Sequence, residues 1–254
     1  MTTRVVIPAR YASERLPGKP LVDIAGRPMI QHVWERATAS GAGEVIVATD
    51  EERIVAACGR FGARAEMTAA DHVSGTDRIA EIAARLDWDE DDIVVNVQGD
   101  EPLIPPATIR QVAELLLGRP DADMATLCTP IHDLAEFLDP NVVKLVMRED
   151  GSALYFSRAP IPWQRDGAPA GLASQTRYTD SLRHLGIYAY RCRALAALSA
   201  AAPAPLENLE RLEQLRALWL GMTILADVAS EVPAHGVDTP EQLEAVRAKV
   251  AAER

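Results

Sequence analysis

Strand-like runs and segments of helical period alternate through the first half of the chain, and this alternation restricts the possible fold more than any other feature. The strand-like runs are RVVIPA (4–9), EVIVATD (44–50), ARAEM (63–67) and DIVVNVQ (92–98). The helical periods occupy residues 29–40, 51–62, 76–86 and 106–118. Runs such as VIVA and IVVNV lack polar alternation, as strands covered on both faces do. The pattern predicts an α/β fold in which helices cover both faces of a mostly parallel sheet.

The pattern changes after about Met124. Three strand-like runs follow without long helices between them, at 142–147, 153–157 and 184–191. They predict antiparallel strands inserted into the sheet or extending it. Residues 163–180, which contain a proline and two glycines, predict a mobile loop.

The end of the chain returns to helices and a strand. We expect a helix over 207–221, a strand over 223–228 and a helix over 239–254. A length of 254 residues suits one large domain or two closely joined halves. We expect a single domain, residues 1–254, with an antiparallel subregion inserted at about 142–191.

Charge and cysteine content exclude several classes of protein. Acidic residues outnumber basic ones by 37 to 26, and the net charge of −11 works against broad binding to nucleic acid or to an anionic membrane surface. Apolar runs are shorter than the ~18 residues of a membrane span, and the first one is too short for a secretory signal. The three cysteines are widely spaced and form no C-x-x-C pair, so neither a disulfide framework nor a zinc site is indicated. We expect a cytoplasmic protein without membrane insertion.

A basic loop, PARYASERLPGKPL (8–21), directly follows the first strand. It carries Arg10, Arg15 and Lys19 in an otherwise acidic chain, and Gly18 lets the backbone approach an anion closely. Ligands of open parallel sheets bind beyond the carboxyl ends of the strands. The loop therefore predicts a polyphosphate site, although a solvated surface loop would have the same spacing.

Other polar residues follow the remaining strands. Asp100 emerges after a buried strand, where it could bind Mg²⁺ beside a triphosphate, or could simply be a turn residue. The hydroxyls of Ser74 and Thr76 could contact a base or sugar, or could only belong to the N-cap of the next helix. His184 and Tyr188 share one face of a strand. Asp238 precedes a complete capping box formed by the residues after it, so its carboxylate is not needed for capping.

Several common site motifs are missing. The one G-x-G, at residues 41–43, precedes a strand instead of following one, which excludes the dinucleotide-binding motif. Neither H-E-x-x-H nor G-x-S-x-G occurs.

Seven motifs in order resemble those of the nucleotide-activating cytidylyltransferases, and most closely of the CMP-Kdo synthetases (3-deoxy-manno-octulosonate cytidylyltransferases). The motifs are PARYASERLPGKPL, MTAADHVSGTDR, VNVQGDEP, YFSRAPIPW, RHLGIYAYR, LEQLRALW and GVDTPEQLE. The resemblance implies a Rossmann-like α/β nucleotidyltransferase fold with an antiparallel insertion used in homodimerisation. It also implies the Mg²⁺-dependent reaction of CTP with Kdo, giving CMP-Kdo and pyrophosphate for lipopolysaccharide synthesis.

The resemblance further implies roles for particular residues. Those around the nucleotide are Pro8, Arg10, Arg15, Lys19, Ser74, Arg78 and Gln98. Those around the sugar acid are Gln98, Arg158, His184, Tyr188, Glu213 and Gln214, with Arg158 or His184 as the cation for its carboxylate. The metal ligands are Asp100 and Asp238, and the catalytic residues are Arg10, Lys19 and Asp100.

Three alternatives stay open at this point. The first is a cytidylyltransferase for another sugar acid, such as a sialic acid. The second is a nucleotide-sugar glycosyltransferase of similar topology, although its usual D-x-D would have to be residues 87–89, which precede a strand instead of following it. The third is a nucleotide sensor without catalytic activity.

Overall fold

The computed structural model describes residues 1–12, 16–168, 170–234 and 236–252. Its main sheet consists of β1 (Thr3–Ala9), β4 (Glu44–Thr49), β5 (Arg64–Met67), β6 (Ile93–Asn96), β7 (Met124–Pro130), β8 (Lys144–Met147), β9 (Ala153–Ser157), β10 (Leu182–Arg191) and β11 (Ile224–Val228). A small hairpin, β2 (Asp23–Ile24) and β3 (Arg27–Pro28), lies apart from this sheet.

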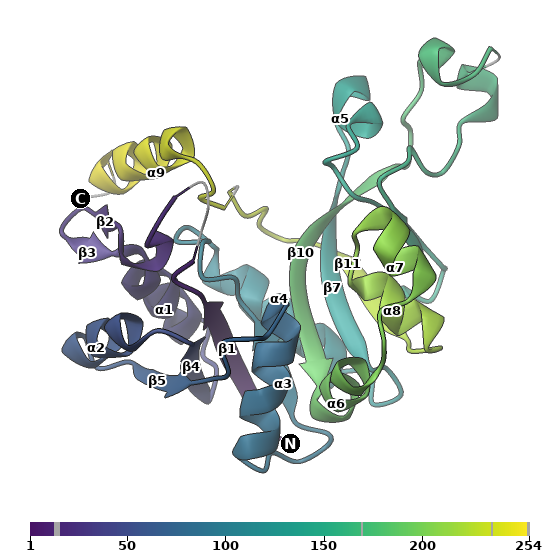
Figure 1. Cartoon of the computed structure of the whole chain (residues 1–254). Helices are drawn as coiled ribbons and strands as arrows, with labels where there is room; N and C mark the ends of the chain where they lie inside the picture. The colour runs from purple at the N-terminus through teal and green to yellow at the C-terminus, as the bar shows by residue number, and fades with distance from the viewer. Residues whose placement is uncertain (13–15, 169, 235, 253–254) are drawn as a thin grey trace.

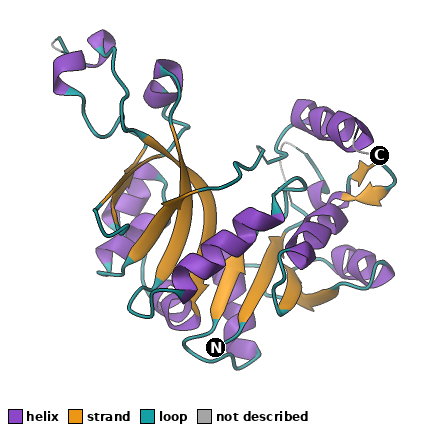
Figure 2. Cartoon of the chain, turned by 180° about the vertical axis from the view of Figure 1, so that it is seen from behind, coloured by secondary structure: helices purple, strands orange, loops and turns teal. Residues whose placement is uncertain are grey.

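The helices lie on both faces of the sheet, as the alternation predicts (Figures 1 and 2). They are α1 (Met29–Ala39), α2 (Glu52–Arg60), α3 (Gly75–Arg85), α4 (Pro106–Leu117), α5 (Leu134–Leu138), α6 (Cys192–Ala200), α7 (Pro205–Glu210), α8 (Gln214–Trp219) and α9 (Pro240–Ala252). In the described part of the chain, none of them is both long and apolar enough to cross a membrane.

The strand order along the sheet is β11-β7-β10-β6-β1-β4-β5. β6, β1, β4 and β5 pair in parallel, which confirms the expected parallel half. β10 is antiparallel to both of its neighbours, β6 and β7, so the expected antiparallel strand lies inside the sheet. The β8–β9 hairpin pairs with the first residues of β10.

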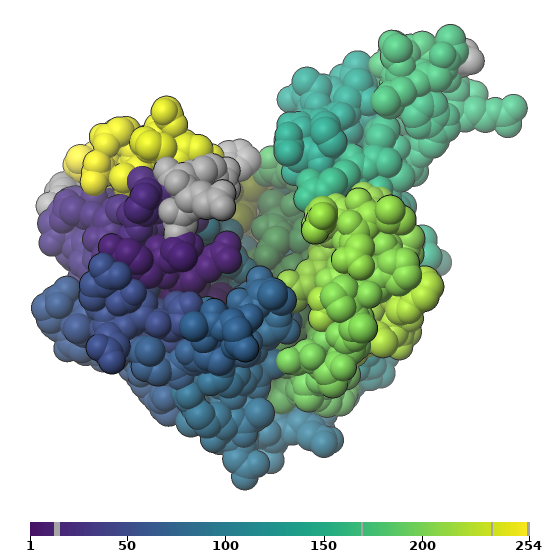
Figure 3. Space-filling model, in the orientation of Figure 1, coloured from purple at the N-terminus to yellow at the C-terminus, as the bar shows by residue number. Residues whose placement is uncertain are grey.

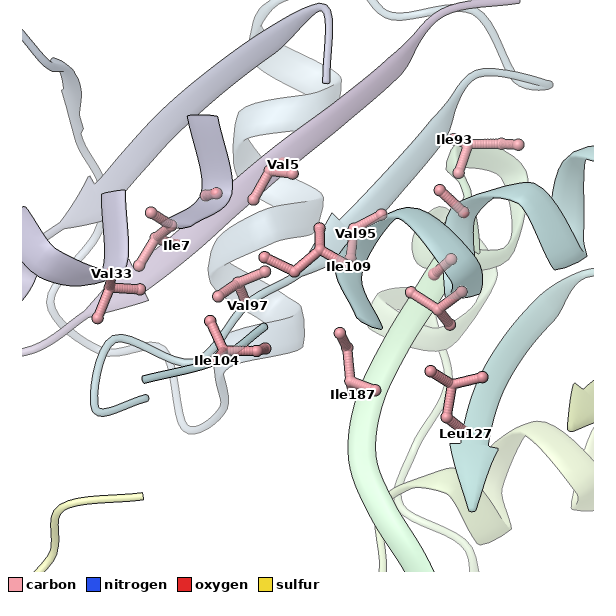
Figure 4. Packing of buried hydrophobic residues seen from close by; sticks show 14 of the residues in the cluster. Val5, Ile7, Val33, Ile93, Val95, Val97, Ile104, Ile109, Leu127 and Ile187 are labelled. Atoms are coloured by element: carbon pink, nitrogen blue, oxygen red, sulfur yellow. The ribbon is translucent and has the colours of Figure 1, made fainter. Parts of the chain in front are cut away.

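Successive residues of the central strands enter different cores because side chains of a strand alternate between its faces. Val5, Ile7 and Val95 pack with α1, α2 and α4 on one face, and Figure 4 shows part of this cluster. Val6 and Val94 pack with α3, α6 and α8 on the other face. Two covered faces explain why these strands are mostly apolar and lack a regular polar alternation.

Other expectations were wrong in detail. The single helix expected over 207–221 is two helices, α7 and α8, because the chain turns at Arg211, whose φ of 53° is left-handed. Residues 163–180 contain two short 3-10 turns, Arg165–Gly167 and Leu172–Ser174. Together with α5, this segment projects from the body of the molecule (Figure 1). β7 and α6 were not expected as separate elements.

Candidate active site

A cavity of about 240 Å³ opens at the carboxyl ends of β1 and β6. Its walls contain every predicted nucleotide- or metal-binding residue that the structure describes: Pro8, Arg10, Lys19, Ser74, Arg78, Gln98, Asp100 and Asp238. Arg15 lies outside the described residues. In the space-filling view, the surface is hollowed between the purple N-terminal residues and the green residues around α7 (Figure 3). We call the cavity that these residues line the nucleotide cavity.

Two glycines allow the walls of the nucleotide cavity to meet. Gly18 has a φ of 68°, a left-handed conformation that glycine adopts without strain, and it turns the loop into the 3-10 turn Lys19–Leu21. A Cβ at Gly99 would lie 2.8 Å from the carbonyl oxygen of Pro8. The turn after β6 can therefore pack against the end of β1 only because it lacks a side chain there. This packing places Asp100 beside Lys19.

Lys19 joins the two predicted metal ligands. Its Nζ donates to Oδ2 of Asp100 at 2.6 Å and to Oδ1 of Asp238 at 2.9 Å. Burial alone would lower the pKa of Lys19, but the hydrogen bonds and charges of the two carboxylates outweigh burial and raise that pKa above its ordinary value. Lys19 is therefore charged at neutral pH. Burial and the neighbouring Asp100 raise the pKa of Glu101 to about 8, which keeps Glu101 protonated beside this group.

Asp238 reaches the site through a long connection. β11 lies at the far edge of the sheet, and residues 229–239 lead from it to α9. The amide of Val237 donates to the carbonyl of Asp100 at 2.8 Å and fixes the two segments together. The expected capping box is confirmed, because the amide of Gln242 donates to Oγ1 of Thr239. The carboxylate of Asp238 faces Lys19 instead.

The two carboxylates fit a divalent cation. Lys19 contacts both of them, which shows that they can share one positive group. Mg²⁺ commonly takes one or two carboxylates and completes its octahedron with phosphate oxygens and water. Among the described residues, no group of three or more His, Cys, Asp or Glu side chains could hold a metal. A metal here would therefore need ligands from a substrate or from water.

Ser74 and Arg78 border the nucleotide cavity from α3. Ser74 caps this helix, since its Oγ accepts from the amide of Asp77 at 3.1 Å. Arg78 is only 4% exposed and donates to Oδ2 of Asp50 at 3.2 Å and to Oγ1 of Thr68. Arg78 thus holds the loop before α3 against the end of β4. The helix-cap explanation for Ser74 is correct, and Ser74 still lines the cavity.

A second cavity of about 90 Å³ adjoins the first, and we call it the sugar cavity. It contains four of the six predicted sugar-binding residues, Gln98, Tyr188, Glu213 and Gln214. The Tyr188 hydroxyl and the Gln214 Nε2 are buried there without a hydrogen-bond partner in the described part of the protein. Burial raises the pKa of Glu213. Buried polar atoms without partners are costly, so this cavity is suited to a polar ligand that would satisfy them.

The other two predicted sugar-binding residues are not in the described walls of the sugar cavity. His184 packs against Phe156 and Tyr188 with ring-centre distances of 5.1 and 5.2 Å, and burial lowers its pKa to about 3. It is therefore neutral at physiological pH and cannot supply the expected positive charge. Arg158 donates through Nε to the carbonyl of Glu210 at 2.6 Å. Of the two residues expected to bind the carboxylate of the sugar acid, only Arg158 is a cation.

Sequence reasoning missed two polar side chains of the sugar cavity, Asn96 and Tyr190, whereas Thr76, which the sequence suggested as a contact of a base or sugar, does line it. Asn96 gave one usable signal in the sequence, because it is a polar residue inside the apolar run IVVNV. In the structure it is only 4% exposed. Tyr190 gave none, since a tyrosine in a strand is common. The D-x-D at residues 87–89 precedes β6 and so lies at the opposite end of that strand.

Comparisons with known proteins show which proteins the chain is similar to. The family model described as cytidylyltransferase matches residues 4–224. The 3-deoxy-manno-octulosonate cytidylyltransferases of Marinobacter nauticus and Thioalkalivibrio sulfidiphilus are each 56% identical to the chain, covering 98% and 97% of it and 97% and 98% of their own lengths. A solved structure of CMP:2-keto-3-deoxy-manno-octonic acid synthetase complexed with CTP superimposes with a TM-score of 0.89 at 44% identity, with both chains covered completely. A cytidylyltransferase from Leptospira borgpetersenii shares the fold, with a TM-score of 0.65 at 19% identity over 99% of this chain and 87% of its own.

Proposed function

The chain belongs to the cytidylyltransferase family, and on that premise we propose that it transfers a cytidylyl group from CTP to Kdo for lipopolysaccharide synthesis. The anomeric hydroxyl oxygen of Kdo forms a bond to the α-phosphorus of CTP. The bond from that phosphorus to the bridging oxygen breaks, its electron pair leaves with pyrophosphate, and the hydroxyl proton is released. Such a transfer needs mainly positioning of the two substrates and neutralisation of the developing charge.

One observation carries the proposal: Gln98 lines both the nucleotide cavity and the sugar cavity. A triphosphate in the first cavity and a sugar acid in the second would meet beside this side chain. Holding two reactants in contact removes much of the entropic cost of a bimolecular step. The site therefore supports joining of a nucleotide to a polar second substrate.

On the nucleotide side, we assign binding of the triphosphate to Arg10 and Lys19, with Arg15 as a further candidate from the same loop. Lys19 is held by two carboxylates, and Arg10 is an exposed residue that directly follows β1. Charge-assisted hydrogen bonds from such groups are stronger than neutral ones. Ser74 and Arg78 border the same space.

We assign the metal site to Asp100 and Asp238. Mg²⁺ bound there would neutralise phosphate charge and orient the α-phosphate. The chain's own contribution is to hold both carboxylates on one side of the nucleotide cavity, through the contact between Val237 and the Asp100 carbonyl.

We further propose that the enzyme is a cytoplasmic homodimer. The three cysteines are buried free thiols, as expected in a reducing compartment. The projecting segment around the two 3-10 turns exposes about half of Trp163 and Leu172, which suits burial against a second copy. Sedimentation should give a mass of two 27.5 kDa chains. A single chain at micromolar concentration would contradict the dimer.

Pyrophosphate release tests the proposed function. The purified protein should release pyrophosphate from CTP only when Kdo is added, and ATP, GTP and UTP should replace CTP poorly. A panel of sugar acids that includes a sialic acid distinguishes Kdo activation from activation of a relative. Release that is independent of every sugar acid, or that occurs only with another one, would contradict the assignment.

Replacing Tyr188 with phenylalanine should weaken the use of Kdo without loss of stability. The Tyr188 hydroxyl has no partner in the described protein, so its removal relieves an unsatisfied buried group in the free enzyme but removes a contact to the bound sugar. We expect the KM for Kdo to rise by about 10-fold, with an unchanged or higher Tm. Calorimetric titration with CTP should give the wild-type Kd. Equal losses for CTP and Kdo would refute the sugar-cavity assignment.

A further inference from the structure

Tyr11 links the two cations that we assign to the triphosphate. It directly follows Arg10, and its side chain packs against Gly18, which directly precedes Lys19. A Cβ at Gly18 would lie 3.0 Å from the Tyr11 hydroxyl oxygen and 3.2 Å from its ring carbons Cε2 and Cζ, so a side chain there would have to displace the ring. This close contact brings the two ends of the basic loop together, and with them Arg10 and Lys19.

Arg53, on α2, contacts the Tyr11 ring from a second segment. Its guanidinium carbon lies 3.8 Å from the ring centre, which is within the range of a cation–π contact. Tyr11 is also partly buried against the core cluster that contains Val5 and Ile7. The ring is therefore held by α2, by Gly18 and by the core.

Glu51 fixes the orientation of Arg53. The Glu51 carboxylate accepts from Nε and Nη2 of Arg53 at 2.8 and 2.9 Å, and its Oε1 also accepts from the Arg53 amide at 3.2 Å. A planar guanidinium bound through two nitrogens has a defined direction. Arg53 is already paired with a carboxylate and is not among the described walls of the nucleotide cavity, so it is not a further cation for the phosphates. Its contact with the basic loop is through Tyr11.

We propose that Tyr11 is a positioning residue for the triphosphate, whose ring, held by Arg53, keeps Arg10 and Lys19 side by side. The proposal rests on the proposed function, because it takes the nucleotide cavity as the site of CTP. Two cations that are held together before the ligand arrives lose less conformational freedom when they bind it. An exposed ion pair such as that of Arg53 adds little to the stability of a fold. The loss of Arg53 should therefore appear in the binding of CTP and not in the Tm.

The first test is Arg53→Ala, which removes the cation from the ring. The Arg53 side chain is 59% exposed, so we expect a Tm close to wild type. Calorimetric titration should give a Kd for CTP that is raised about 3-fold, and the KM for Kdo should not change. Arg119→Ala is the matched control, because Arg119 forms the same two-nitrogen ion pair with Asp121 two residues away. Arg119 contacts no aromatic ring within the described ranges, and its replacement should leave the Kd for CTP unchanged.

The second test replaces the ring itself. Tyr11→Leu keeps an apolar side chain and should raise the Kd for CTP by about 10-fold, with the wild-type KM for Kdo at saturating CTP. Tyr11→Phe keeps the ring and its contacts with Arg53 and Gly18, so it should bind CTP as the wild type does. Tyr155→Leu is the control, since Tyr155 is a partly buried tyrosine of β9 outside the described walls of both cavities. A loss in Tyr11→Phe as large as that in Tyr11→Leu would contradict positioning by the ring.

A double-mutant cycle separates positioning from direct binding. Because Arg53 acts through the ring, adding Arg53→Ala to Tyr11→Leu should raise the Kd for CTP by clearly less than it does in the wild type. An undiminished effect, or a wild-type Kd in Tyr11→Leu, would overturn the proposal. If Tyr11→Leu folds poorly, Arg53→Ala decides alone, and a wild-type Kd in that variant overturns the proposal. In each of these cases the wild-type protein still releases pyrophosphate from CTP with Kdo, so the proposed function stands, whereas a wild-type protein that does not bind CTP would remove both.

Discussion

Replacing Lys19 with alanine should lower kcat/KM by about 100-fold or more. The change removes a charge-assisted contact to the triphosphate, whose charge shifts in the transition state. It also leaves Asp100 and Asp238 facing each other without the ammonium group that now lies 2.6 and 2.9 Å from them. Arg10→Ala should cause a loss of the same order. Steady-state pyrophosphate release with CTP and Kdo measures both variants.

A control and a binding measurement make this prediction sharper. Lys249, on the exposed side of α9, is a matched lysine whose replacement by alanine should leave kcat/KM unchanged. Without CTP, the Lys19→Ala protein should bind Mn²⁺ more tightly than wild type, because the ammonium group of Lys19 no longer competes for the two carboxylates. Wild-type kinetics in Lys19→Ala would show that the basic loop is only a surface turn.

The sequence predicted the parallel half of the fold well, because a strand buried on both faces is apolar along most of its length. β1, β4 and β6 are apolar at nearly every position, and this follows from two cores meeting at one sheet. β7, MATLCTP, was missed because threonine, cysteine and proline interrupt its apolar run. The break between α7 and α8 was missed because a left-handed arginine at 211 has no sequence signal comparable to a glycine.

The site residues also divide into those that the sequence pattern predicts and those that depend on tertiary contacts. Residues that follow parallel strands were predicted to converge, since the carboxyl ends of such strands share one edge, and Lys19, Asp100 and Gln98 do meet there. The roles of Arg158 and His184 depend on what the antiparallel strands bury, and this is a tertiary property. His184 shares a strand face with Tyr188 as expected, yet burial keeps its imidazole neutral.

Asp238 is the residue for which sequence and structure together give the sharpest test of the metal site. Thr239 and Gln242 provide the capping box of α9, and the Asp238 side chain is 45% exposed and forms an ion pair with Lys19. An ion pair with this much exposure contributes only ~0.2–1 kcal/mol to stability. A large effect of its replacement on activity would therefore have to come from function.

Asp238→Asn keeps the shape and hydrogen-bonding capacity of the side chain and removes its charge. We expect kcat/KM to fall by about 100-fold, with a Tm close to wild type and partial recovery in excess Mg²⁺ or Mn²⁺. The recovery follows because the weaker site still has Asp100, phosphate oxygens and water as ligands. Glu241→Gln, an exposed carboxylate in the first turn of α9, should have no such effect and serves as the control. An active Asp238→Asn enzyme with the wild-type dependence on Mg²⁺ would remove Asp238 from the metal site and leave it its ion pair with Lys19.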